Sequence, residues 1–437
     1  MGVVVTDMDV EVGTVQWPAA PTGTVEPGPP PRPVDPLRPV ARAARRAGLH
    51  RIHVVAWRDL DDPEAGGSEL HAHHIASRWA DAGLDVTMRA SAVADAPSVI
   101  GRSGYRAIRK SGRYMVFPRS ALSGAVSRRG RPDALVEVWN GMPFLSPLWA
   151  RCTRVVFLHH VHAEMWRMTL PPALARVGEM VERRLAPPVY RRTRVVTLSE
   201  SARREIVAML GLRPERVAVV PPGVDPRFAP GPGRSPTPLV LVVGRLVPVK
   251  RLPMLVDALV AARARVPDLR AVVVGEGYAR PEVEAVLRRT GAEHYVELVG
   301  RCDEDELVEL YRRAWVLASA SQREGWGMTI SEAAACGTPA VVTRIAGHRD
   351  AVAHGESGLL VDDSASMADA LVAVLRDRVL RERLRRGALA AAGRLSWEAT
   401  AARTLELVVA EHVARRASPW PPLAGTDRQP AGAARAR

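Results

Sequence analysis

The chain has 437 residues, a formal net charge of +14 at pH 7 and a pI near 10.8, which favours anionic partners such as lipid headgroups, nucleotides or nucleic acid. Its length predicts two or three domains, and no apolar run approaches the roughly 18 residues of a membrane-spanning helix. The N-terminus lacks a signal-peptide pattern and the three cysteines lack disulfide or zinc spacing, so we expect a cytoplasmic protein.

Residues 1–48 are rich in proline and lack apolar periodicity, which predicts a disordered extension. From Arg51, short apolar runs alternate with helical patterns, as in βαβ units that build a parallel sheet. We assign residues 49–222 to a first Rossmann-like domain. Its expected strands lie at 52–57, 86–89, 134–138, 155–158 and 195–198.

A stretch rich in proline and glycine, residues 223–238, is predicted to be a linker. The alternation then restarts in a second Rossmann-like domain, residues 239–395. Its expected strands lie at 239–243, 271–274, 296–299, 315–318, 340–343 and 358–361. Residues 396–416 have one long helical pattern, and residues 417–437 are predicted to be a disordered tail. The expected fold is α/β, with two doubly wound domains facing each other across a cleft.

Two glutamates in the second domain, Glu324 and Glu332, are separated by seven residues. The segment between them begins with Gly325, Trp326 and Gly327 and runs into a helical pattern. An expected strand precedes it, and ligands of open α/β sheets bind where a strand leads into a helix. Two carboxylates there can accept hydrogen bonds from vicinal hydroxyls, which both a sugar and a ribose present.

A basic loop follows the first strand of this domain. Gly244 lets the backbone approach a phosphate, and the next helix adds the positive end of its dipole. Arg245 and Lys250 supply cationic hydrogen-bond donors for a diphosphate. Gly277 follows another strand, where it serves either a tight turn or a backbone approach to a base.

In the first domain, Gly66 and Gly67 precede a helix and permit close approach to a phosphate or sugar ring, although a plain flexible loop fits the pattern too. His159 and His160 end a strand, where one imidazole can hydrogen-bond a sugar. His71 and His74 share a helix face, but no third ligand is evident, so we expect no metal site.

These motifs together resemble the retaining nucleotide-sugar glycosyltransferases of the GT-B fold, in the large family 4 (group 1) that carries the E-x7-E motif. The resemblance covers about residues 51–415. The matching elements, in family order, are Gly66-Gly67, His159-His160, V-x-x-G-V-D at 220–225, G-R-L-x-x-x-K at 244–250, V-G-E-G at 274–277, E-G-W-G-x-x-x-x-E at 324–332 and G-E-S-G-L-L-V at 355–361. It implies that the first domain binds the acceptor, that the second binds the nucleotide-sugar donor, and that the final helix crosses back to the first domain.

The resemblance also implies the role of each matching residue. Arg245 and Lys250 would hold the donor diphosphate, Glu324 the sugar hydroxyls and Glu332 the ribose. A histidine would contact the donor sugar, either His159, which aligns better by strand length, or His160. The remaining donor contacts would come from Gly66, Gly67, Gly244, Gly277, Gly325, Trp326 and Gly327. Pro222 departs from the family, which often has asparagine before the glycine of the V-D segment.

The implied activity is retaining transfer of a hexose-type sugar from a UDP- or GDP-linked donor to a hydroxyl of a glycan or lipid-linked acceptor, in cell-envelope synthesis. We expect no cofactor. Two other classes of protein fit parts of the sequence. A GT-B-fold nucleotide-sugar epimerase would lack the E-G-W-G segment, and a non-catalytic protein would use the same surfaces to bind lipid or nucleic acid.

Residues 102–131, from Arg102 to Arg131, contain nine Arg or Lys, no Asp or Glu, and interspersed aromatic and aliphatic residues. The segment is either a solvated basic face or a surface for an anionic membrane. No nucleic-acid-binding motif accompanies it, so we expect no nucleic-acid partner. The membrane interpretation predicts peripheral attachment at the inner face of the cell membrane.

Overall fold

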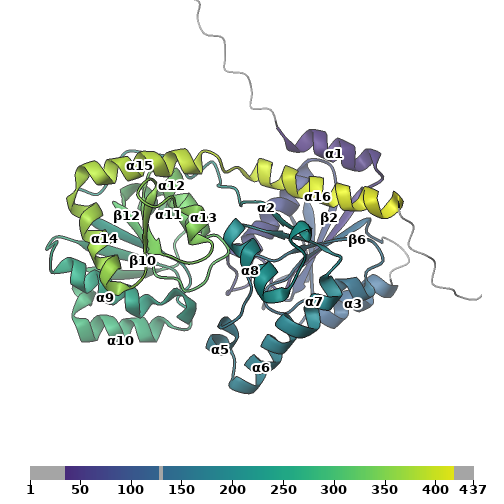
Figure 1. The fold of residues 1–437 in the computed structure, drawn as a ribbon, viewed down its shortest axis with the longest axis horizontal. Coiled ribbons are helices and arrows are strands. Elements are labelled where there is room, and N and C mark those ends of the chain that lie inside the picture. The colour runs from purple at the N-terminus through teal and green to yellow at the C-terminus, as the bar shows by residue number, and fades with distance from the viewer. Residues whose placement is uncertain (1–34, 127–130, 418–437) are drawn as a thin grey trace, which may run out of the picture. The chain divides into compact units, whose positions relative to one another are not determined.

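Two separate sheets form the core of the computed structural model, which describes residues 35–126 and 131–417 (Figure 1). The first sheet has eight strands in the order β3-β4-β2-β1-β5-β6-β7-β8, and only the β3–β4 pair is antiparallel. The strands are β1 (Arg51–Val55), β2 (Asp85–Ser91), β3 (Val99–Arg102), β4 (Tyr105–Ser111), β5 (Ala134–Val138), β6 (Thr153–Phe157), β7 (Arg194–Thr197) and β8 (Val217–Val219).

Helices cover both faces of this sheet. Those that follow its strands are α2 (Gly67–Asp81), α3 (Val116–Val126), α4 (Ser146–Trp149), α5 (Met165–Thr169), α6 (Pro172–Met180), α7 (Ala186–Tyr190) and α8 (Glu200–Leu210), with a π-helical turn at Val181–Leu185 and a 3-10 turn at Pro214–Arg216. The face that carries Ile52 and Val54 packs against α2, while α3 and α4 lie over the opposite face.

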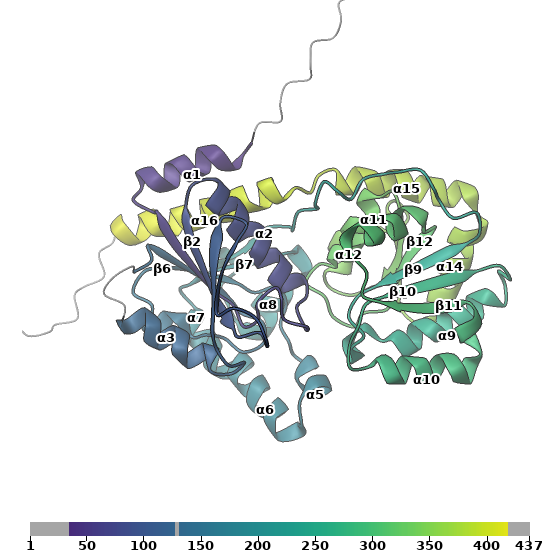
Figure 2. The same cartoon turned by 180° about the vertical axis from the view of Figure 1, so that it is seen from behind.

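The second sheet has six parallel strands in the order β11-β10-β9-β12-β13-β14. They are β9 (Leu239–Val243), β10 (Arg270–Val274), β11 (Val296–Gly300), β12 (Val316–Ser319), β13 (Ala340–Thr343) and β14 (Gly358–Val361). Its α-helices are α9 (Leu252–Arg263), α10 (Arg280–Thr290), α11 (Glu304–Arg313), α12 (Met328–Ala335), α13 (His348–Ala351), α14 (Ser364–Arg376) and α15 (Arg378–Ala392). Figure 2 shows α9 and α10 on one side of these strands and α11 and α12 on the other.

The last helix, α16 (Trp397–Ala417), packs on the first domain and confirms the predicted crossover. Leu405 and Val408 are fully buried in the core of that domain, and the Trp79 indole of α2 donates a hydrogen bond of 3.0 Å to the Ala401 carbonyl. A helix in this position covers apolar surface that the first sheet would otherwise expose to water.

The prediction of disorder through residue 48 was wrong in part, because α1 (Leu37–Arg46) is a helix that lies beside α16 in both views. Leu37, Ala41 and Ala44 recur at helical spacing and are buried. Residues 1–34 and 418–437 of the two predicted disordered segments lie outside the described residues. The β3–β4 hairpin and β8 were not predicted.

Candidate functional site

Two loops at the carboxyl edge of the second sheet bring Lys250 and Glu324 together. Lys250 ends a 3-10 turn, Pro248–Lys250, after β9, and Glu324 lies in the loop between β12 and α12. The two side chains form an ion pair, and the Ser321 hydroxyl donates to the same Glu324 oxygen at 2.9 Å. Burial raises the pKa of Glu324, but the charges of Lys250 and His348 outweigh it and lower that pKa to about 2. Glu324 is therefore an ionised hydrogen-bond acceptor at neutral pH.

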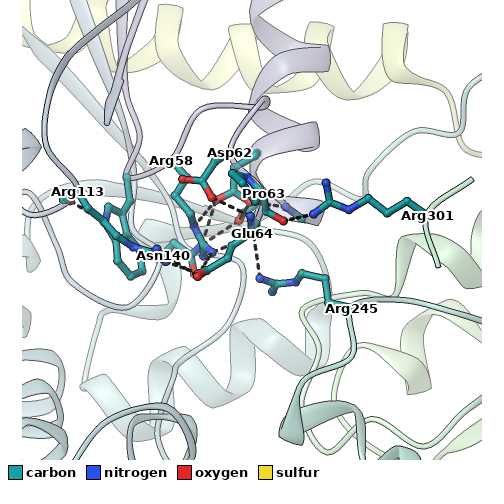
Figure 3. Close-up of polar contacts among 12 residues, drawn as sticks. Arg58, Asp62, Pro63, Glu64, Arg113, Asn140, Arg245 and Arg301 are labelled. Carbon is teal, nitrogen blue, oxygen red and sulfur yellow. Dashed lines mark hydrogen bonds and ion pairs between the residues drawn. The ribbon is translucent and has the colours of Figure 1, made fainter. Parts of the chain in front are cut away.

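Arg245 reaches from the same edge toward the loop that precedes α2. Its guanidinium donates a hydrogen bond of 2.9 Å to the Glu64 carbonyl, and Arg301 donates to the neighbouring Pro63 carbonyl (Figure 3). A Cβ added at Gly66 would lie only 3.4 Å from the Arg245 guanidinium carbon. Burial lowers the pKa of Arg245, although it stays a cation at any physiological pH. The structure thus brings the predicted glycine turn and the predicted diphosphate ligand together.

The two candidate histidines differ in their surroundings. The His159 ring is buried against His71, with Nε2 3.2 Å from His71 Nδ1. The pKa of His160 is lowered to about 4, mainly by burial, and the nearby charges that act on it include Glu324, Arg245 and Lys250. Its Nε2 is a buried atom with no hydrogen-bond partner among the described residues. Charged groups of the second domain thus act on His160, whereas the ring nitrogen of His159 faces His71.

The turn between the two glutamates is built for close packing. A Cβ at Gly325 would lie 2.5 Å from the His159 carbonyl oxygen, so only glycine permits this approach. The Trp326 side chain is buried, and its indole N–H donates a hydrogen bond of 2.8 Å to the Ser331 hydroxyl. The indole N–H, the one polar group of this side chain, thus stabilises the turn. A contact of Trp326 with the nucleotide sugar would be limited to the carbon atoms of the ring. Gly327 is the residue before α12.

Glu332 lies on α12, as predicted, and its half-buried side chain lies beside Tyr311. The Tyr311 hydroxyl donates to its carboxylate at 2.8 Å. Burial raises the pKa of Glu332 to about 7, and the negative charge of Asp225 adds to the rise. The two glutamates of the motif therefore differ in protonation near neutral pH.

The remaining predicted glycines lie close to these residues, but not all of them face a ligand. A Cβ at Gly244 would be 3.4 Å from Lys250 Cε, and one at Gly67 would be 3.4 Å from the Met328 sulfur. A Cβ at Gly277 would lie 2.2 Å from the Leu246 carbonyl oxygen. Gly277 thus lets two loops of the second domain pack together.

The glycine turn before α2 is held by a polar cluster that sequence reasoning missed. Glu69 is buried and accepts hydrogen bonds from the Gly66 amide at 2.9 Å and from the Ser68 hydroxyl at 2.8 Å. Arg58 Nε lies 3.4 Å from the Glu69 carboxylate, and the Asn140 amide donates to Ser68 at 2.9 Å. Asn140 follows β5, so its contribution depends on the tertiary fold.

Further missed residues join α8 to the second domain. The Asp350 carboxylate accepts from the Glu200 amide at 3.1 Å and from the Ser201 hydroxyl, while the Gly347 amide donates to Ser201 at 2.8 Å. Arg323, next to Glu324, donates a hydrogen bond of 2.7 Å to the Glu205 carboxylate of α8. These partners lie more than a hundred positions apart in the chain, so no local signal could have identified them.

The basic segment 102–131 is partly neutralised by acids outside it. Arg109 and Arg102 lie 2.9 and 3.2 Å from the buried Asp59 carboxylate, and Arg113 forms an ion pair with Glu64 (Figure 3). The expectation of nine cations without a counter-charge was therefore wrong for these three. Arg106, Lys110 and Arg119 remain exposed, with no ion pair among the described residues.

Comparison with known proteins agrees with this geometry. Residues 65–228 match the model of Glycosyltransferase Family 4, and residues 228–390 match that of Glycosyl transferases group 1. The D-inositol 3-phosphate glycosyltransferase of Xylanimonas cellulosilytica is 30% identical over 414 residues, which is 82% of this chain and 95% of that protein. The protein of the same name from Thermobispora bispora is 29% identical over 413 residues, covering 84% and 96% of the two chains.

Solved structures show the same fold at lower identity. Sucrose-phosphate synthase from Thermosynechococcus elongatus superposes with a TM-score of 0.70 at 21% identity, over 82% of this chain and 98% of that one. WaaG, a glycosyltransferase involved in lipopolysaccharide biosynthesis, superposes with a TM-score of 0.64 at 19% identity, over 82% and 99%. The chain belongs to the nucleotide-sugar glycosyltransferases of group 1, which have the GT-B fold.

Proposed function

We propose that this protein is a retaining hexosyltransferase that moves a sugar from a UDP- or GDP-linked donor to an acceptor hydroxyl in cell-envelope glycan or glycolipid synthesis. The observation that carries the proposal is the Lys250–Glu324 ion pair, with Arg245 in the same loop as Lys250 and Glu332 on the helix that follows Glu324. The charges of Arg245, Lys250 and Glu324 also act on His160. Two cations suit a diphosphate, and an ionised and a near-neutral carboxyl group suit the two hydroxyl-bearing rings of a nucleotide sugar.

The proposed mechanism is a front-face substitution. The bond between the sugar C1 and the diphosphate oxygen breaks, and the acceptor oxygen bonds to C1 on the same face. The departing diphosphate oxygen takes the acceptor proton, so no protein base is required. Arg245 and Lys250 stabilise the charge that develops on the diphosphate, and their effect is large because both are partly shielded from water. Glu324 and His160 orient the sugar.

A donor and acceptor panel tests the proposal. UDP- and GDP-hexoses should raise the melting temperature of the protein, and at equal concentration the tighter-binding donor should raise it more. The best donor should support release of nucleoside diphosphate when acceptor is added. Because the names of the relatives specify D-inositol 3-phosphate, that compound is the first soluble acceptor to test, beside lipid-linked glycans. Stabilisation without turnover on any acceptor would favour a non-catalytic binding protein.

Glu332→Gln should raise the donor KM about tenfold and leave kcat nearly unchanged, because a ribose contact is equally strong in the ground and transition states. The pKa of Glu332 is raised to about 7, so its carboxyl group is neutral below that pH and an ionised acceptor above it. The wild-type donor KM should therefore fall as pH rises through about 7, and the variant should lose this dependence. A larger effect on kcat than on KM would exchange the roles of Glu332 and Glu324.

We also propose reversible attachment to an anionic membrane through residues 102–131. Arg106, Lys110 and Arg119 supply positive charge, and Tyr114, Met115 and Leu122 are apolar side chains exposed by 70%, 62% and 64%. This combination fits shallow insertion among anionic headgroups. No helix within the described residues is long and apolar enough to cross a membrane.

Sedimentation with vesicles tests the attachment. Binding should require anionic lipid and should weaken as salt is raised, because screening shortens the range of surface charges. Met115→Asp combined with Leu122→Asp should lower the bound fraction several-fold. Val379→Asp is the matched control, since Val379 is 80% exposed in the second domain. Equal binding to neutral and anionic vesicles would contradict the proposal.

A further inference from the structure

A cavity of about 400 Å³ lies between α3, α4 and the first sheet, and none of its lining residues belongs to the donor site. Strand register explains its position. His53 of β1 pairs with Leu135 of β5, and Val55 pairs with Arg89 of β2, so these four side chains share one sheet face. The opposite face of the same strands packs into the main core, whereas the buried apolar cluster under α3 and α4 is small.

The floor of this cavity carries charge where a core residue would be expected. Arg89 is half-buried, and its guanidinium makes no hydrogen bond or ion pair within the described part of the chain. Burial is the main cause that lowers the pKa of Arg89, and the positive charges of Arg106 and Arg119 lower it further. The pKa of His53 is lowered to about 4 by burial and then by the charge of Arg89. A half-buried cation beside other cations is costly unless an anion joins it.

The surrounding side chains suit an anion with an apolar part. A second, smaller cavity adjoins the first and shares Arg89, Ser120 and Ser123 with it, while Lys110 lines its rim. No Asp or Glu is among the described residues that line either cavity. Leu148 and Trp149 form an apolar wall of the larger one. Hydroxyls and cations thus gather at one end, and apolar surface lies at the other.

We propose that this cavity is a second binding site, which takes a phosphate monoester bearing an apolar group, with Arg89 as its central ligand. A phosphate matches the planar guanidinium with paired hydrogen bonds and can also accept from the serine hydroxyls. Its double negative charge would balance the unpaired positive charge on the cavity floor. The site is separate from the diphosphate ligands Arg245 and Lys250, which lie on the second domain.

Isothermal titration of the full chain tests this site, with three probes that distinguish the source of the phosphate. They are inorganic phosphate, glycerol 3-phosphate and short-chain dihexanoyl phosphatidic acid, with dihexanoyl phosphatidylcholine as the zwitterionic control. We expect phosphatidic acid to bind most tightly, because it also covers the apolar wall. Glycerol 3-phosphate binding as tightly as phosphatidic acid would identify a soluble monoester as the ligand.

Variants separate the proposed site from the donor site. Arg89→Gln should weaken phosphatidic acid binding at least tenfold, whereas Lys250→Ala and the distant surface variant Arg270→Gln should leave it unchanged. Arg89→Gln should also keep or raise the melting temperature, because it removes an unbalanced charge. Ser123→Phe, which fills the cavity from α3, gives a second route to the same loss. Equal affinity in wild type, Arg89→Gln and Ser123→Phe, or no binding of any monoester, would overturn the proposal.

Discussion

Lys250→Ala and Arg245→Ala are each expected to lower kcat by roughly 10²-fold or more, because each removes a charge-assisted contact that strengthens as the diphosphate leaves. Lys250→Ala has a second consequence, since it deprives the half-buried Glu324 carboxylate of its ion-pair partner. The pKa of Glu324 should then rise from about 2 toward the ordinary range. Steady-state kinetics with the best donor measure both variants.

The matched control is Arg270→Ala, which removes an exposed arginine at the start of β10, at the opposite end of the second sheet. It should leave kcat and KM unchanged. Near-normal turnover by both Arg245→Ala and Lys250→Ala would show that the diphosphate binds elsewhere. Lys250→Arg should recover part of the lost rate, because it restores the charge with different geometry.

Glu324→Gln is expected to lower kcat roughly tenfold to a hundredfold. The ionised carboxylate can bind sugar hydroxyls, and its negative charge also stabilises the positive charge that the sugar ring gains in the transition state. An amide retains the shape and loses the charge. The result should appear in kcat as well as in KM, unlike the effect expected for Glu332→Gln.

Glu297→Gln is the control for this substitution, since Glu297 is an exposed glutamate on β11. It should have no effect on either constant. A Glu324→Gln variant that retains the wild-type kcat and shows only a raised KM would mean that Glu324 acts in ground-state binding alone.

Motifs with local physical causes were predictable from the sequence. The strand β9 is an uninterrupted apolar run, and β5 is apolar except for the buried Glu137, as expected for strands buried on both faces. The loop position of Glu324 and the helical position of Glu332 follow from the glycines and the helix-forming residues around them. The crossover of α16 was predicted from the family resemblance, and the burial of Leu405 and Val408 agrees with that prediction.

Features that depend on the path of the chain were not predictable. The burial of β4 alternates along Tyr105–Ser111, but its arginines made the segment look like a basic surface. Neutralisation of Arg109 requires Asp59, which lies 50 residues earlier. His159 and His160 are adjacent in the chain, so strand length favours His159 but does not reveal which ring faces His71 and which one the second-domain charges act on.

The stereochemistry of the product tests the central claim most directly. The wild-type protein is incubated with an α-linked UDP- or GDP-hexose and its acceptor, and the anomeric proton of the product is followed by NMR from the first minutes. Retaining transfer predicts an α-linked product from the start, formed in step with release of nucleoside diphosphate. A β-linked first product, or turnover of the donor without sugar on the acceptor, would contradict retaining transfer by Arg245, Lys250 and Glu324.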